Sequence, residues 1–169
     1  EISAELKLKI QEYAKEKHYK PNRLALNLLN RSTNTIGVVV PNILNYFFVQ
    51  VLYGIEKVAN ENEYNIISCI SDESSSKESK TLEFFDSGTV DGLIISLAEE
   101  TQNDNKHEAL KDIINNDIPV VLFDRVTDAI ECDFVKVKGH KKSEEKSMVD
   151  KIFTLIDKAA RDALREAVL

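Results

Sequence analysis

Hydrophobic and polar residues between positions 33 and 137 follow two alternating spacings. Short β-branched runs, of which Ile36–Val40 is the clearest, are typical of strands that are buried on both faces of a sheet. Between these runs, apolar residues recur every three or four positions, as they do along one side of a helix. The pattern predicts strands over residues 35–40, 64–70, 90–96, 118–123 and 134–137, and helices over residues 46–62, 80–86 and 107–116.

This alternation of strands and helices indicates a fold class. A strand, a helix and a second strand in succession form a right-handed βαβ unit, and such units build a parallel sheet. We therefore predict an α/β fold: a three-layer, doubly wound sheet with strand order 2-1-3-4-5 and helices on both faces. Residues 99–106 are polar and are predicted to form a loop, and residues 74–78 to be flexible or to cap the following helix.

Helical patterns also occur outside this body. Residues 3–17 form one, and Ser3 is suited to cap its start. A second pattern, residues 23–30, is too rich in leucine for a free linker. It is either a short helix packed on its neighbour or a segment that folds only against a partner. Residues 143–169 place apolar side chains on one helical face, which either covers the sheet or joins a partner chain.

Charge is distributed unevenly along the chain. Residues 32–135 carry six Lys or Arg and nineteen Asp or Glu, a net charge of −13, whereas residues 1–31 carry seven and four, a net charge of +3. Residues 136–169 carry nine and six, again a net charge of +3. Because an acidic body repels nucleic acid, we expect contact with a phosphate backbone only at the chain ends.

The sequence does not contain the motifs that would indicate several common kinds of chemistry. The chain has no GxGxxG, GxxxxGK[ST] or GxSxG motif, and no acidic cluster after the first predicted strand. Cys69 and Cys132 are far apart without a CxxC motif, and the His residues share no ligand spacing, so we expect reduced thiols and no metal site. No apolar stretch is long enough to cross a bilayer. We predict a cytoplasmic protein that is not an enzyme and needs no cofactor.

Polar and aromatic side chains follow the predicted strands at their C-terminal ends, where ligands bind in open α/β sheets. This mixture suits a polar small molecule such as a sugar or a nucleobase. In a simpler interpretation, Phe47 and Phe48 are the first core residues of a helix, and Asp124 and Arg125 form a loop salt bridge. The residues at these strand ends are Asn42, Asn45, Phe47, Phe48, Ser71, Asp72, Ser96, Asp124 and Arg125.

Five short motifs follow one another along the chain. They are Y-x-P-N-x-x-A-x-x-L from Tyr19, T-x-x-I-G from Thr33, P-N-I-x-N-x-F-F from Pro41, V-D-G-L-I from Val90 and P-V-V-x-F-D-R from Pro119. Each motif is weak alone, but their combination in this order and spacing is specific. Over residues 3–135 the chain resembles the LacI/GalR family of bacterial transcriptional regulators.

The resemblance implies a DNA-binding role for the N-terminal segments. Residues 1–20 resemble the last helix of a helix-turn-helix headpiece. Residues 21–32 resemble the hinge helix, which folds when a dimer sits on operator DNA. Leu28 matches the leucine that wedges into the minor groove. The residues that match hinge positions in contact with DNA are Asn22, Arg23, Leu24, Ala25 and Leu28.

Residues 33–137 resemble the N-terminal lobe of a periplasmic-binding-protein-like core, whose effector would be a sugar or a similar polar metabolite. Phe47 and Phe48 match positions at or near the effector cleft, and Asp124 and Arg125 match polar positions that contact the effector. The helix over residues 46–62 resembles one used in dimer contacts, which implies a homodimer. Together with two polar strand-end residues, the expected effector-binding set is Asn45, Phe47, Phe48, Ser96, Asp124 and Arg125.

The chain also departs from the family pattern. The first headpiece helices, including the recognition helix, would lie before Glu1, and residues 138–169 match no part of the second lobe. We therefore expect a truncated or shortened regulator, in which effector binding changes whether paired hinge helices fold on operator DNA. Two alternatives belong to other classes: a solute-binding lobe without a DNA role, and a flavodoxin-like enzyme that binds a flavin or a nucleotide.

Overall fold

The chain divides into two compact units, Glu1–Ser32 and Thr33–Leu169. The computed structural model describes residues 3–20, 22, 27, 29 and 32–135. Of the residues matched to hinge contacts with DNA, Asn22 is described, whereas Arg23, Leu24, Ala25 and Leu28 lie outside the described residues. The predictions for residues 138–169 also lie outside them.

The described part of the first unit contains the helix α1, Ala4–Glu16. Its start has the predicted cap, because Ser3 Oγ accepts a hydrogen bond from the Leu6 backbone N–H at 3.3 Å. No residue of α1 is buried.

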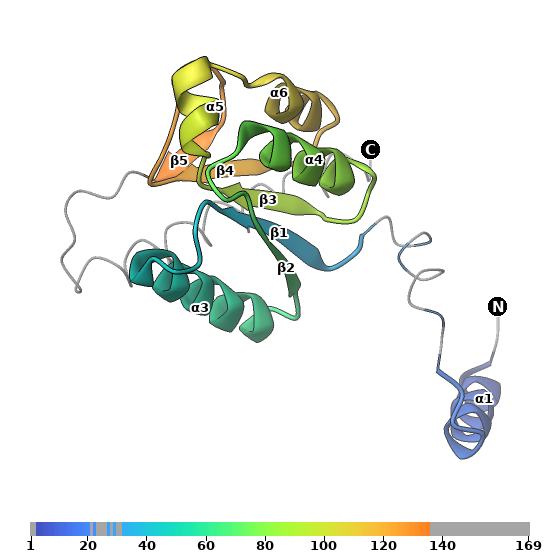
Figure 1. Ribbon diagram of the computed structural model, residues 1–169. Helices are drawn as coiled ribbons and strands as arrows, with labels where there is room; N and C mark the ends of the chain where they lie inside the picture. The colour runs from blue at the N-terminus through green and yellow to red at the C-terminus, as the bar shows by residue number, and fades with distance from the viewer. Residues whose placement is uncertain (1–2, 21, 23–26, 28, 30–31, 136–169) are drawn as a thin grey trace. The chain divides into compact units, whose positions relative to one another are not determined.

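Five strands form one sheet in the second unit. They are β1 (Thr35–Val40), β2 (Asn65–Ile70), β3 (Gly92–Ile95), β4 (Val120–Phe123) and β5 (Asp133–Val135). Their order is β2-β1-β3-β4-β5 and every neighbouring pair is parallel, as Figure 1 shows. The predicted fold class and strand order are therefore confirmed.

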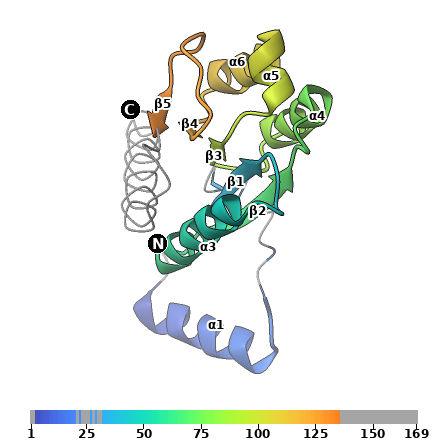
Figure 2. The ribbon, with the colours of Figure 1, turned by 60° about the vertical axis from the view of Figure 1, so that its left-hand side comes forward.

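Side chains alternate between the two faces of the sheet and form a core on each. Val38 is fully buried on the face covered by α3, Tyr46–Glu61. Val39 is fully buried on the opposite face, which α4 (Ser75–Asp86) and α6 (Glu108–Asn115) cover. Figures 1 and 2 show these helices on opposite sides of the sheet. Because both faces are covered, the inner strands β3 and β4 are buried at every position.

The motif residues at the start of the sheet have structural roles. Asp91 Oδ1 accepts hydrogen bonds from the backbone N–H and the hydroxyl of Thr33, at 2.6 and 2.7 Å. Its Oδ2 accepts one from the Asn34 N–H at 2.8 Å. Asp91 therefore fixes the two residues that precede β1 beside the start of β3. Gly37 lies against the ring of Phe85, where a Cβ atom would come within 2.9 Å of Phe85 Cε2.

Two predicted boundaries need correction. The helix α4 begins at Ser75 rather than at residue 80. The segment predicted as a loop over residues 99–106 contains a helix, α5, Glu99–Asp104, so that prediction is wrong over most of its length. This helix has no apolar periodicity. It is stabilised instead by carboxylates from elsewhere in the chain, which accept hydrogen bonds from N–H groups at its start. None of the helices among the described residues is long and apolar enough to cross a membrane.

Candidate functional site

The C-terminal ends of the parallel strands meet at one edge of the sheet, and two serines flank the end of β1 there. The Ser71 N–H donates to the Val40 carbonyl, and the Ser96 N–H donates to the Val39 carbonyl, both at 3.0 Å. Both serines are fully buried, and neither hydroxyl has a hydrogen-bond partner among the described residues. Buried polar groups are normally paired, so two buried hydroxyls without a partner among the described residues distinguish this edge of the sheet.

The loop after β1 leads into α3. Asn45 is exposed and caps this helix, because its Oδ1 accepts a hydrogen bond from the Phe47 N–H at 3.0 Å. The rings of Phe47 and Phe48 are 8% and 2% exposed and belong to the core under α3. Phe48 packs edge-on against Phe123, with ring centroids 6.2 Å apart. Their packing in the core matches the simpler interpretation, and a role of either ring in effector binding stays a prediction.

Asp124 and Arg125 follow β4, as predicted. Asp124 has a φ of +59° and donates its N–H to the Val135 carbonyl at 3.0 Å, so it turns the chain sharply at the strand end. Arg125 reaches the loop between β2 and α4, where Glu73 binds both terminal nitrogens of its guanidinium group. Nη2 donates to Glu73 Oε1 at 2.8 Å, and Nη1 donates to Oε2 and also to the Leu97 carbonyl at 3.3 Å.

This ion pair connects the loops after three strands. Glu73 Oε2 also accepts a hydrogen bond from the Glu99 N–H, at 2.9 Å, at the start of α5. The hydrogen bond from Arg125 lowers the pKa of Glu73, and the same contact raises the pKa of Arg125. Both side chains are partly exposed, 28% for Arg125 and 33% for Glu73, so the pair lies at the surface of the site.

Glu78 is a residue of this region that the sequence analysis missed. It is 2% exposed, and its carboxylate accepts hydrogen bonds from the Ala98 N–H at 2.6 Å and the Thr101 hydroxyl at 2.7 Å. Burial raises the pKa of Glu78. Its spacing from Leu82 and Phe85, both buried on the same helix, is the signal that would have placed it on the inner face.

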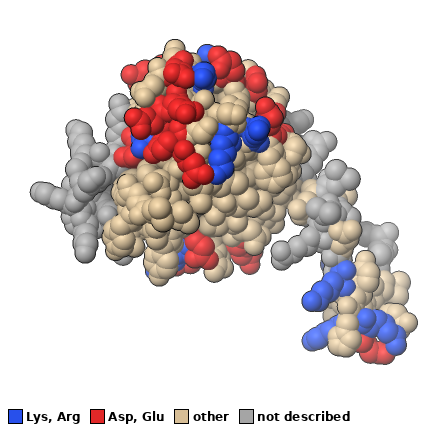
Figure 3. Space-filling view, viewed as in Figure 1, with Lys and Arg blue, Asp and Glu red and all other residues tan. Residues whose placement is uncertain are grey.

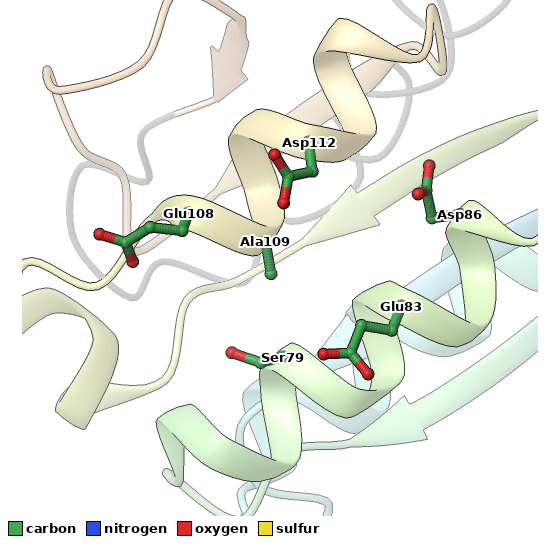
Figure 4. A pocket seen from close by; sticks show the side chains of 6 residues that line it. All are labelled: Ser79, Glu83, Asp86, Glu108, Ala109 and Asp112. Carbon is green, nitrogen blue, oxygen red and sulfur yellow. The ribbon is translucent and has the colours of Figure 1, made fainter.

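A separate groove of about 260 Å³ lies between α4 and α6. Figure 4 shows four carboxylates around it, and its lining consists of Ser79, Glu83, Asp86, Glu108, Ala109 and Asp112. Asp86 is already engaged, because both of its carboxylate oxygens accept hydrogen bonds from the Asn116 side chain. Within the described residues, no group of His, Cys, Asp or Glu side chains is placed to hold a metal ion.

The parallel sheet and its strand order define a lobe of the doubly wound α/β class. Residues 33–162 match a family described as periplasmic binding proteins and the sugar binding domain of the LacI family. The chain belongs to this family, and the resemblance to LacI/GalR regulators is confirmed.

Individual relatives cover much of this chain but less of their own length. Catabolite control protein A of Staphylococcus aureus is 34% identical over 122 residues, which are 72% of this chain and 35% of that protein. The HTH-type transcriptional regulator pepR1 of Lactobacillus delbrueckii subsp. lactis is 29% identical over 147 residues, 87% of this chain and 42% of that protein. The chain therefore spans well under half the length of these relatives.

Solved structures show the same fold. A LacI-family transcriptional regulator from Silicibacter pomeroyi has a TM-score of 0.59 at 28% identity, over 82% of this chain and 40% of that chain. The lac repressor dimer bound to operator and the anti-inducer ONPF has a TM-score of 0.66 over 82% of this chain and 41% of that chain. At 19% identity, the second likeness is one of fold alone.

Proposed function

We propose that this chain is the N-terminal lobe, with the hinge and the last headpiece helix, of an effector-responsive transcriptional regulator of the LacI type. The observation that carries the effector site is the pair of buried hydroxyls of Ser71 and Ser96 beside the end of β1, neither of which has a hydrogen-bond partner in the described part of the chain. Hydroxyls in this position suit the hydroxyl groups of a sugar or a similar polar metabolite. Asn45, Phe47, Phe48, Ser96, Asp124 and Arg125 remain the proposed effector-binding residues.

The DNA-binding part of the proposal is supported by the family and by named relatives that are regulators. In the full-length protein, Asn22, Arg23, Leu24, Ala25 and Leu28 would contact operator DNA as a hinge. The protein would act as a homodimer with contacts through α3. Its helix surface supports this, because Tyr46, Val49 and Tyr53 are apolar or aromatic and exposed. Effector binding would then change operator affinity through the geometry of the lobes.

Effector binding is tested by calorimetric titration of this chain with a panel of neutral sugars and nucleosides. A member of the panel should bind the wild type, and Ser96→Ala should weaken that binding by about three- to tenfold, the worth of one neutral hydrogen bond. Ser96→Ala should leave the stability of the free chain unchanged, since the hydroxyl makes no hydrogen bond to the residues that the structure describes. Ser76→Ala, at an exposed position of α4, is the matched control.

Failure of the whole panel to bind, or equal binding by the wild type and Ser96→Ala, would contradict the proposed site. The regulatory part is tested separately with the full-length protein. Its operator affinity, measured by fluorescence anisotropy, should change when the ligand identified in the titration is added. An unchanged affinity would contradict effector control, and no operator binding by the full-length protein would favour a solute-binding lobe without a DNA role.

A further inference from the structure

We propose that Glu73 sets the charge class of the effector: with Glu73 in place, the site accepts a neutral polar ligand and rejects a phosphorylated one. This inference rests on the effector site proposed above. It concerns the guanidinium group of Arg125, which is the cation expected to contact the effector.

The first argument is geometric. A guanidinium group presents a planar fork of N–H donors that fits a carboxylate and a phosphate in the same bidentate way. In this structure the Glu73 carboxylate occupies that fork through Nη1 and Nη2 of Arg125. A phosphate group that takes this fork would therefore have to displace Glu73, and one on the remaining N–H groups of Arg125 would lie beside an ionised carboxylate. A ligand hydroxyl needs only a single N–H, and the contacts of Arg125 with Glu73 and the Leu97 carbonyl use three of the five that an arginine carries.

The second argument is the anchoring of Glu73. Besides Arg125, its carboxylate accepts the hydrogen bond from the Glu99 N–H at 2.9 Å. The contact with Arg125 lowers the pKa of Glu73, so the carboxylate stays ionised at neutral pH. Displacing Glu73 would break bonds to two loops and leave an ionised carboxylate without its partner. The ion pair is therefore a stable part of the site, and a ligand would not easily replace Glu73 at Arg125.

The third argument is the charge around the pair. Glu73 neutralises Arg125, and the further carboxylates of Asp124 and Glu99 act on Arg125 electrostatically. Lys77, on the neighbouring helix, forms an ion pair with Asp72. Figure 3 shows acidic side chains gathered over the surface where α4, α5 and α6 lie. A phosphate approaching this edge would meet a net negative charge, whereas a neutral sugar would not be repelled.

The test is a calorimetric titration with inorganic phosphate as the probe. The wild type should show no binding, and Glu73→Gln, which keeps the side-chain shape but removes the charge, should bind phosphate at least about tenfold more tightly, the worth of one charged hydrogen bond. The double variant Glu73→Gln with Arg125→Gln should lose this gain. Glu61→Gln, an exposed residue of α3, is the matched control and should behave as the wild type.

Three results would overturn the inference: phosphate binding by the wild type equal to that of Glu73→Gln, no binding by a Glu73→Gln variant whose circular dichroism shows it folded, or a gain that survives in the double variant. If Glu73→Gln does not fold, the wild-type titration with phosphate decides, and binding there overturns the inference. Failure of every neutral sugar to bind would contradict the proposed function instead, and would leave the phosphate result standing.

Discussion

The carboxylate of Glu78, on α4, accepts a hydrogen bond from the backbone N–H of Ala98 at 2.6 Å, although the two residues are 20 positions apart. The same carboxylate accepts the hydroxyl of Thr101 at 2.7 Å. A helix as short as α5 is not stable alone, and a carboxylate at its N-terminus both satisfies a backbone donor and complements the helix dipole. Glu78 therefore holds α5 and the chain after β3 in place from inside the core.

Replacing Glu78 with Ala should lower the free energy of unfolding by about 2–3 kcal/mol, because it leaves a buried N–H and a buried hydroxyl without partners. Glu83 lies on the same helix and is exposed, so Glu83→Ala should change stability by no more than about 0.5 kcal/mol. Urea denaturation followed by circular dichroism measures both. Equal stability of the two variants would show that the Glu78 contacts are energetically unimportant.

Stability should also depend on pH through His107. This side chain is 3% exposed, and burial, followed by the charge of Lys111, lowers its pKa below the usual 6.5. Because the folded pKa is depressed, the unfolded chain takes up the proton first as pH falls. The contribution of His107 to stability is therefore full above pH 6.5 and is lost as pH drops through the folded pKa.

We expect the melting temperature of the wild type to fall between pH 7.5 and pH 5 by more than that of His107→Gln, which cannot titrate. His18→Gln, at an exposed position of the N-terminal unit, is the control for the substitution itself. Parallel melting curves for the wild type and His107→Gln across this range would contradict the assignment. Differential scanning calorimetry in matched buffers makes the comparison.

The glycines of two motifs should respond differently to a methyl group. A Cβ atom at Gly37 would lie 2.9 Å from Cε2 of Phe85, which is fully buried, whereas one at Gly92 would be 3.6 Å from the Pro119 carbonyl oxygen. Gly37→Ala should therefore destabilise the fold by about 1–3 kcal/mol through overpacking, and Gly92→Ala should be tolerated. Combining Gly37→Ala with Phe85→Leu should cost less than the sum of the two single changes, as measured by urea denaturation.

Much of the fold was predictable because its information is local. The run Ile36–Val40 and most of its counterparts are strongly apolar, and the handedness of βαβ crossovers leaves few topologies for such a pattern. The helix α5 was missed because its stabilising carboxylates, Glu73 and Glu78, lie 20 or more positions before it. A six-residue polar segment carries no periodicity of its own that would reveal such partners.

The candidate site, too, could be predicted only in part from the sequence. Ser96 and Arg125 were identifiable because each lies at the C-terminal end of a predicted strand, and parallel strands end at a common edge. The partner of Arg125 was not identifiable, since Glu73 is 52 positions away and a long-range ion pair leaves no local pattern. That the Ser96 hydroxyl has no partner among residues 32–135 likewise depends on the packing of several elements, which residue order alone does not give.

The last prediction concerns DNA. The 169-residue chain tested alone should bind no operator with high specificity, because the resemblance assigns base reading to a recognition helix that would precede Glu1. The acidic body, with a net charge of −13 over residues 32–135, opposes what the N-terminal residues gain from phosphates. We expect weak association that falls as salt rises, since each neutralised phosphate releases counterions. The basic residues available for it are Lys15, Lys17, Lys20, Arg23 and Arg31.

Fluorescence anisotropy with random and palindromic duplexes at two or more salt concentrations measures this association. Lys15→Gln should reduce the slope of log affinity against log salt by about 0.9, the value for one lost phosphate contact, while Lys57→Gln on α3 should leave it unchanged. Leu28→Ala should have little effect in this chain, because a minor-groove wedge acts only once two hinge helices are docked. In the full-length protein the same change should abolish operator binding. Tight binding that prefers one sequence and survives physiological salt would show that residues 1–31 or 136–169 read DNA directly.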